Sequence, residues 1–436
     1  MATTVDQNIL PGTNLHWLQN FGWLNEIQRP ESKLNLFINE KMGELQRMRE
    51  AESTSAAAQE YSEAEYFKRR IHDMSTESVI AALSENAVIP KYGFPVDVVG
   101  LDVMGKYRKD TDINLQRDLS IAISEYAPGS EVIVDGQKYV SRYINVPRKG
   151  GLKRYFYYEC PNCGNLEISD TPIADMTECP ICKTVVHTQN RYFIEPDLGF
   201  STDKFARRSR TARPIKTYSS KAQYIGGGEK DQAYYDYRSS MHIESYKNDK
   251  LAIINENSFY YCPVCGYTKV DRTSYKNAIH EKHNTPFNAE CSNDKLEHIA
   301  LGHVFSTDVV KIHLNISAEK DEMITLAFAI LEGMSHYLQI ERSDINGLVI
   351  AEDTNRYAII LYDNVPGGAG YVKQIMNDDV MDHVLRTAQD IVNQPCCDDE
   401  TTCYKCLRNY YNQSHHKQMK KKYAKRLLSA ILGGIK

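Results

Sequence analysis

Apolar residues recur at intervals of three and four along the first part of the chain, and this spacing predicts helices. Residues 33–49 and 64–83 both follow it. Residues 52–58 between them are small or polar, and we interpret them either as a low-complexity spacer or as a continuing helix. Residues 1–87 are therefore predicted to form a helical N-terminal region that serves in packing or partner contact.

The pattern changes near residue 88 to alternating apolar and polar positions. Such alternation lies on both sides of Asp135-Gly136, between Glu131 and Val146. An Asp-Gly dipeptide between two alternating segments is typical of a β-hairpin with a two-residue turn. Residues 88–300 are therefore predicted to be rich in β-structure.

The last third of the chain mixes both periods. A predicted strand at 303–314 precedes a helix, two short strands at 348–351 and 357–362, and a second helix. This order predicts an α/β domain over residues 301–436. The whole chain is accordingly assigned to the α+β class, with a helical N-terminal region, a β-rich middle and an α/β C-terminal domain.

A glycine-rich turn precedes the second of these helices. Gly367-Gly368-Ala369-Gly370 could offer bare N–H groups to a phosphate. However, the chain has no Gly-x4-Gly-Lys-Ser/Thr sequence, so the turn is not a nucleotide-binding P-loop. We expect these glycines instead to allow close packing of a helix against a strand.

Composition restricts the class of protein. The chain has 436 residues, of which 42% are hydrophobic and 25% are charged, as in soluble proteins of two or three domains. It has no apolar run long enough to span a membrane, and its first residues lack the features of a signal peptide. We therefore expect a cytoplasmic protein with no membrane partner.

The eleven cysteines fall into groups with the spacing of zinc ligands. In a chain without secretory features this grouping favours metal sites over disulfides. The first group has two Cys-x2-Cys pairs separated by fifteen residues, which can bring four thiolates to one tetrahedral ion. Its predicted ligands are Cys160, Cys163, Cys179 and Cys182.

The second and third groups account for the remaining cysteines. Cys262, Cys265 and Cys291 need a fourth ligand, for which we favour His283, with His280 as the open alternative. The third group is Cys396, Cys397, Cys403 and Cys406. Four protein ligands leave no position for a catalytic water, so three structural Zn2+ ions are expected. They either position loops for a partner or only stabilise the fold.

Positive charge is concentrated in two segments, although the net charge is −5. Residues 401–436 contain nine Lys or Arg and no Asp or Glu, and residues 207–216 are also basic and lie near several tyrosines. Such segments favour a polyanionic partner, although each could also be a solvated surface. The candidate nucleic-acid-binding residues are Arg207, Arg208, Arg210, Arg213, Arg408, Lys420, Lys421 and Lys422.

Together, these motifs resemble a known family. Asp363-x2-Pro-Gly-Gly-Ala-Gly, Cys403-Tyr-Lys-Cys-Leu-Arg-Asn-Tyr and Asn412-x3-His416 are similar to the zinc-binding (MZB-type) domain at the C-terminus of mitomycin-repair-type superfamily-two helicases. Further motifs upstream extend the resemblance over roughly residues 88–430, and the stand-alone form resembles the DrmB-like proteins of the DISARM anti-phage system. Adjacent Cys396-Cys397, where relatives have Cys-x-Cys, is a departure from the family pattern.

The resemblance implies a non-catalytic subunit that pairs with a superfamily-two helicase of the DrmA type and helps it hold DNA during anti-phage defence. Two alternatives remain. One is a metal-dependent nuclease or other hydrolase, for which Asp398-Asp399-Glu400 is the candidate acidic cluster. The other is a general zinc-ribbon nucleic-acid-binding protein without a dedicated helicase.

Overall fold

The structure is a computed structural model. It describes residue 29, single positions between 64 and 75, and the ranges 32–58, 98–104, 115–134, 137–147, 151–203, 207–208, 220–272, 279–353, 356–365, 367–409 and 412–433. The chain divides into two compact units, Met1–Val96 and Asp97–Lys436, which are treated separately. Most of the predicted helix at 64–83 lies outside the described residues, as do Arg210 and Arg213.

The first unit contains one long described helix, α2 (Lys33–Ala57). It begins at Ser32, whose side chain accepts the N–H of Asn35. The helix continues through residues 52–57, so this segment is a continuing helix and not a spacer. The segment contains neither proline nor glycine, the two residues most unfavourable to a helix.

The second unit is built mainly of β-strands, with its longer helices near the C-terminal end. Its described helices and 3-10 turns are α5 (Leu119–Glu125), α6 (Lys320–Leu338), η2 (Val372–Met376), α7 (Asp378–Asn393), η3 (Gln413–His415) and α8 (Lys421–Gly433). Its described strands are β1 (Val98–Asp102), β2 (Gln116–Asp118), β3 (Glu131–Val134), β4 (Gln137–Ile144), β5 (Arg154–Glu159), β6 (Leu166–Ser169), β7 (Met176–Glu178), β8 (Val185–His187), β9 (Tyr192–Ile194), β10 (Phe200–Thr202), β11 (Arg207–Arg208), β12 (Ser220–Tyr224), β13 (Glu229–Tyr237), β14 (Met241–Tyr261), β15 (Thr268–Val270), β16 (Ile279–His280), β17 (Lys295–Leu314), β18 (Ile345–Ala351) and β19 (Tyr357–Asp363).

The strands form two larger sheets and one hairpin. In the larger sheet the order is β12-β14-β17-β9-β5-β6, with β13 and β15 on β14, β16 and β19 on β17, and β18 on β19. The second sheet has the order β11-β4-β10-β1-β2, with β3 beside β4, and β7 pairs with β8. The predicted hairpin is confirmed, since β3 and β4 pair antiparallel with Val134 opposite Gln137.

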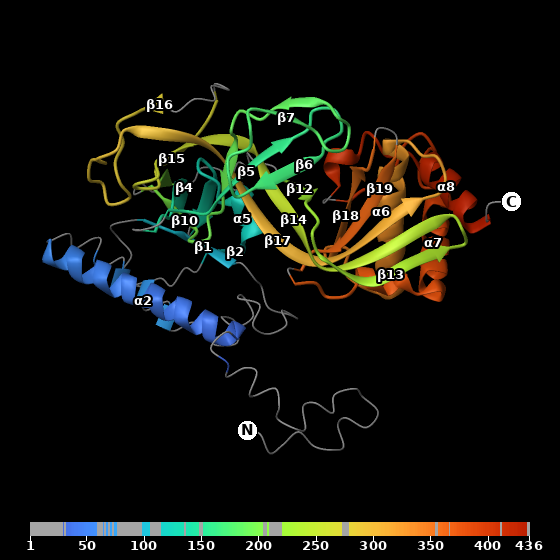
Figure 1. Ribbon diagram of the computed structural model, residues 1–436, viewed down its shortest axis with the longest axis horizontal. Helices are drawn as coiled ribbons and strands as arrows, with labels where there is room; N and C mark the ends of the chain where they lie inside the picture. Colours follow the sequence, from blue (N-terminus) through green and yellow to red (C-terminus); the bar gives the residue numbers. More distant parts are fainter. Residues whose placement is uncertain are drawn as a thin grey trace, which may run out of the picture. The chain divides into compact units, whose positions relative to one another are not determined.

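Two long strands run through the second unit. β14 and β17 pair antiparallel from Met241 opposite Leu314 to Tyr261 opposite Glu297, and they extend from the cysteine-rich strands to the three C-terminal helices (Figure 1). The predicted domain boundary at residue 300 falls inside β17, and the three-part division of the chain stays a prediction. The α+β class is confirmed.

The largest core lies between the sheet and the C-terminal helices. α6, α7 and α8 cover the end of the sheet formed by β17, β18 and β19 (Figure 1), and their apolar faces share one buried cluster. α6 begins with a capping box between Glu319 and Glu322. On α8, Leu427 and Ile431 are fully buried in this cluster. A second core forms where α5 packs on β1, β10, β14 and β17.

The glycine-rich turn after β19 encloses a carboxylate of its own chain. The backbone N–H groups of Ala369 and Tyr371 donate to one oxygen of Asp363 and that of Val372 donates to the other, at 2.7 to 3.1 Å. Gly368 has φ +75°, and a Cβ there would overlap the Asp308 side chain. These N–H groups are thus already bound, which explains physically why the turn is not a phosphate site.

Among the described helices, none combines the length and the hydropathy needed to cross a bilayer.

Candidate metal centres and the basic C-terminal surface

The first four cysteines lie on two facing turns. Cys160 and Cys163 occupy the turn between β5 and β6, and Cys179 and Cys182 occupy the turn between β7 and β8. Sγ of Cys160 lies 3.4 Å from Sγ of Cys182, and Sγ of Cys163 lies 3.6 Å from Sγ of Cys179. All four ligand atoms are within 4.8 Å of one another.

The backbone shapes the Cys-x2-Cys turns that begin at Cys160, Cys179 and Cys262 in the same way. The residue four positions after the first cysteine has a positive φ, at Gly164 (76°), Lys183 (61°) and Gly266 (78°). Its N–H donates back to the carbonyl of that cysteine. At Gly266 a Cβ would overlap the carbonyl oxygen of Ile144, so only glycine fits there.

The second cluster contains one histidine. The atoms of Cys262, Cys265, His283 and Cys291 lie within 4.8 Å of one another. His283 is buried, and the carbonyl of Glu281 lies 2.9 Å from Nδ1. Its buried Nε2 has no hydrogen-bond partner in the described structure. Such an arrangement fits a neutral imidazole that donates through Nδ1 and offers Nε2 to a metal.

His280 has different surroundings. Its side chain is 69% exposed, and Nδ1 lies 3.0 Å from a carboxylate oxygen of Asp294. It does not belong to the group of ligand atoms around Cys262. The two histidines left open by the sequence are thus placed differently, and we propose His283 as the fourth ligand.

The third cluster lies in the loop between α7 and α8. Cys396, Cys397, Cys403 and Cys406 bring their sulfur atoms within 4.8 Å of one another. Sγ of Cys397 lies 3.9 Å from Sγ of both Cys396 and Cys406. The two adjacent cysteines thus both reach the cluster.

The sulfur separations fit zinc and not disulfides. Measured Sγ–Sγ distances across the clusters are 3.4 to 3.9 Å, whereas a disulfide bond is about 2.05 Å long. A tetrahedral ion with Zn–S bonds of about 2.3 Å places its sulfur ligands about 3.8 Å apart. The three clusters therefore suit three Zn2+ ions.

Local hydrogen bonds favour the thiolate form of one cysteine in each of the first two clusters, whereas burial raises the pKa of other ligand thiols, including Cys163 and Cys397, to about 12. Contacts with the side chains of Thr184 and Asn162 lower the pKa of Cys182 to about 5. The neighbouring Cys265 thiol lowers the pKa of Cys262 to about 4, against the opposing effect of burial. A thiol that is already deprotonated needs no proton loss when the metal binds.

The lysines of α8 face the zinc loop. Lys420 and Lys422 both pair with Glu400, at 3.2 and 2.5 Å, and Lys425 pairs with Asp399 at 2.7 Å. Lys422, with Lys420, holds the pKa of Glu400 below its usual range. Two carboxylates of the Asp398-Asp399-Glu400 cluster are thus ion-paired, and much of the positive charge at the start of α8 is compensated within the chain.

Lys421 and Arg408 are also held by their own chain. Lys421 is 1% exposed, and its ammonium donates to the carbonyls of Gln394 (2.5 Å) and Cys397 (3.2 Å). Lys421 is therefore not available to a phosphate, contrary to our expectation for this residue. Arg408 donates to the hydroxyls of Thr401 and Thr402 and to a backbone carbonyl. Arg207 and Arg208 form β11 beside β4.

The exposed tip of the Cys403–Cys406 turn in the third cluster was not among the predicted nucleic-acid-binding residues. Tyr404, between Cys403 and Cys406, is 70% exposed and packs edge-on against His416 at 5.6 Å. Lys405 and Lys417 are exposed, and within the described part of the chain neither pairs with a carboxylate. A cysteine knuckle presents its two middle residues outward, and this geometry could have indicated Tyr404 and Lys405 from the sequence.

Residues 326–407 match the family described as MZB, the MrfA Zn-binding domain. The predicted MZB-type resemblance is therefore confirmed, and the matched segment runs from α6 to the third cluster. We refer to it below as the MZB segment.

One curated relative and two solved structures extend the comparison. Druantia protein DruE from Escherichia coli (strain UMEA 4076-1) is 24% identical over 415 residues, which cover 82% of this chain but 22% of DruE. The chain thus spans less than a quarter of that relative's length. The DUF1998 helicase MrfA bound to DNA matches 76% of this chain and 33% of its own, with 9% identity and a TM-score of 0.37. The complex of MrfA with DNA and AMPPNP gives a TM-score of 0.34.

Proposed function

We propose that this chain is a non-catalytic, zinc-stabilised companion of a superfamily-two helicase and that it adds contacts to DNA in defence against phage. The observation that carries the proposal is the MZB segment, which places a closed metal cluster beside exposed cations. The named relatives are an anti-phage protein and a helicase, which agrees with this role. A DrmB-like position beside a DrmA-like helicase in the cytoplasm is the specific form that we propose.

The proposed role of zinc is structural. Each cluster has four side chains around one position, so a bound ion has no site left for a reactive water. The ligands we propose are those of the three clusters, with His283 in the second. Asp399 and Glu400, the carboxylates that a nuclease site would need, are paired with lysines of α8.

The proposed DNA contact is the outer surface of the third cluster. Tyr404 offers an exposed ring for stacking, and Lys405 and Lys417 offer charges that no described carboxylate neutralises. Lys420 and Lys422 lie at the edge of this surface, but they share Glu400. The third cluster holds the Cys403–Cys406 turn in place. Its zinc ion therefore supports the DNA contact without itself touching DNA.

The test is co-expression with a DrmA-like superfamily-two helicase, followed by DNA-binding measurements on the purified complex. We expect co-purification, and we expect Lys405→Glu/Lys417→Glu to weaken DNA binding and to reduce the salt dependence by a slope of about 1 per lysine. Lys183→Glu/Lys282→Glu, on the other two zinc-bearing regions, is the matched charge control.

Three outcomes would contradict the proposal. Failure of the two proteins to associate at micromolar concentration would remove the helicase partner. DNA affinity that does not change when the helicase is added would favour a general zinc-ribbon DNA-binding protein. Cleavage of DNA by the purified chain with Mg2+ or Mn2+ would establish a nuclease.

A further inference from the structure

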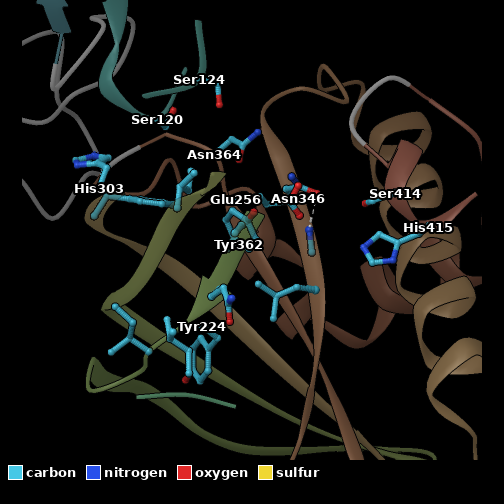
Figure 2. Close-up of a pocket in the computed structure, with 18 of the residues that line it drawn as sticks. Ser120, Ser124, Tyr224, Glu256, His303, Asn346, Tyr362, Asn364, Ser414 and His415 are labelled. Atoms are coloured by element: carbon cyan, nitrogen blue, oxygen red, sulfur yellow. Dashed lines mark hydrogen bonds between the residues drawn. The ribbon is translucent and has the colours of Figure 1, made fainter. Parts of the chain in front are cut away.

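A large groove crosses the second unit, and Cys163 of the first metal cluster is among its lining residues. Its volume is about 2220 Å³, well above the 300–1,000 Å³ typical of small-molecule pockets. Figure 2 shows Ser120 and Ser124 of α5 on one side of it, Ser414 and His415 of η3 on another, and Tyr224, Glu256, Asn346 and Tyr362 of the sheet between them. A space of this size fits a polypeptide segment better than a metabolite.

Strand edges border this groove. Consecutive residues line it from β18 (346–351), from β6 (166–168) and from β12 (222–224). The face of a strand would present only alternate residues, so it is the edges of these strands that adjoin the groove. Within the described residues, β18 pairs only with β19, β6 only with β5 and β12 only with β14. An unpaired edge offers backbone N–H and C=O groups to an added strand.

Apolar side chains accompany these edges. Leu348 and Ile350 of β18 and Phe305 of β17 line the groove, and so does Ile121 of α5, which is 46% exposed. An extended segment that pairs with β18 would bury its alternate side chains against them.

The groove has an excess of negative charge. Eight of its lining residues are Asp or Glu and three are Lys or Arg. Two of those three cations already form ion pairs: Arg117 with Glu125 at 3.2 Å and Lys311 with Glu352 at 2.7 Å. Glu167 and Asp344 have no Lys or Arg partner in the described structure, and burial with the nearby Glu341 raises the pKa of Asp344. Such a groove repels a nucleic-acid backbone and attracts a basic segment.

We propose that the groove binds an extended segment of a partner protein in which Lys or Arg alternates with apolar residues, and that the segment pairs with the free edge of β18. Its basic side chains meet Glu167 and Asp344, and its apolar side chains pack on Leu348, Ile350 and Phe305. This site is separate from the DNA contact proposed above and does not depend on the helicase.

The experiment uses the full chain and a fluorescein-labelled peptide of alternating lysine and valine, with binding followed by fluorescence anisotropy. We expect saturable binding that weakens as salt is raised, and no binding of a glutamate–valine peptide. Glu167→Lys/Asp344→Lys should weaken binding by at least about tenfold. Glu178→Lys/Asp390→Lys, which changes the same charge outside the groove, should leave it unchanged.

Zinc content and near-ultraviolet circular dichroism show whether the variants fold. If the variants do not fold, the salt dependence of peptide binding to the unmodified chain still tests the inference. Equal binding of the two peptides, equal losses in the groove and control variants, or single-stranded DNA displacing the peptide would each overturn it. Concentration-dependent self-association that the groove variant abolishes would show that a second copy of this chain is the occupant, and would also overturn it. The DNA affinity of the groove variant should remain unchanged. A failure of the peptide-binding proposal can therefore be told apart from a failure of the proposed DNA-binding function.

Discussion

Two histidines only three residues apart have different chemical roles available to them. His283 is buried with Nδ1 beside a carbonyl and Nε2 among three sulfur atoms, whereas His280 is exposed and lies beside Asp294. Burial of an imidazole nitrogen without a partner is unfavourable, and a metal ion removes that cost. His283 thus has the surroundings of a candidate ligand, whereas His280 has those of a surface ion pair.

At this scale we predict the metal content of three variants. His283→Ala should lower bound zinc from three ions per chain to two, because three cysteines alone leave the second cluster open. His283→Cys should retain three ions, and His280→Ala should also retain three. Inductively coupled plasma mass spectrometry of the purified chain measures this. Loss of zinc from His280→Ala and not from His283→Ala would reverse the assignment.

At the scale of elements, the third cluster and α8 form one structure. Lys421 at the start of α8 donates to the carbonyls of Gln394 and Cys397, and the loop carboxylates Glu400 and Asp399 pair with Lys422 and Lys425 of the same helix. The ion pairs are exposed and contribute little each, whereas the bonds of Lys421 are buried. The position of α8 therefore depends more on the buried Lys421 than on the exposed lysines that form ion pairs.

We predict that two neighbouring lysines respond very differently to the same substitution. Lys421→Met leaves two carbonyls without a donor and should lower the free energy of unfolding by about 1–3 kcal/mol. Lys422→Met removes only an exposed ion pair and should change it by less than about 0.5 kcal/mol. Urea unfolding followed by circular dichroism measures both. Equal effects would show that the contacts of Lys421 do not stabilise α8.

At the scale of the whole molecule, β14 and β17 connect the β-rich region and the C-terminal α/β domain, which the sequence pattern predicts as separate parts. β17 begins beside the second metal cluster and ends beneath the C-terminal helices, and β14 pairs with it over almost its full length. A cut at residue 300 would divide β17 within its paired region. The cysteine-rich and helical parts of the second unit therefore share one continuous sheet.

This continuity predicts cooperative unfolding of the second unit. Peptides from β14, α6 and α7 should lose hydrogen-exchange protection at the same urea concentration, because none of these elements keeps its packing when the long strands separate. Hydrogen–deuterium exchange mass spectrometry of the intact chain across a urea series provides the measurement. Earlier loss of protection in α6 and α7 would instead support independent domains on either side of residue 300.

The local pattern was sufficient for much of this protein. The Cys-x2-Cys spacing determines the knuckle turns, and the alternation around Asp135-Gly136 determines the hairpin, because both depend on residues only a few positions apart. The period of the apolar residues likewise located α6 and the start of α2, although it could not decide whether α2 continues through residues 52–57.

Other features needed the tertiary structure, because they depend on groups that are distant in sequence. The cysteine pattern favoured His283 but left His280 open as the alternative, and only the placement of the loop that bears them against Cys262 separates the two. The lysines of α8 appeared free until Asp399 and Glu400 were brought to them, and the acidic groove combines strand edges from three separate regions of the chain. Sequence alone determined which residues can bind a metal or carry a charge. Tertiary contacts decided which of those groups are buried, paired or left available, because burial and pairing are properties of three-dimensional neighbours.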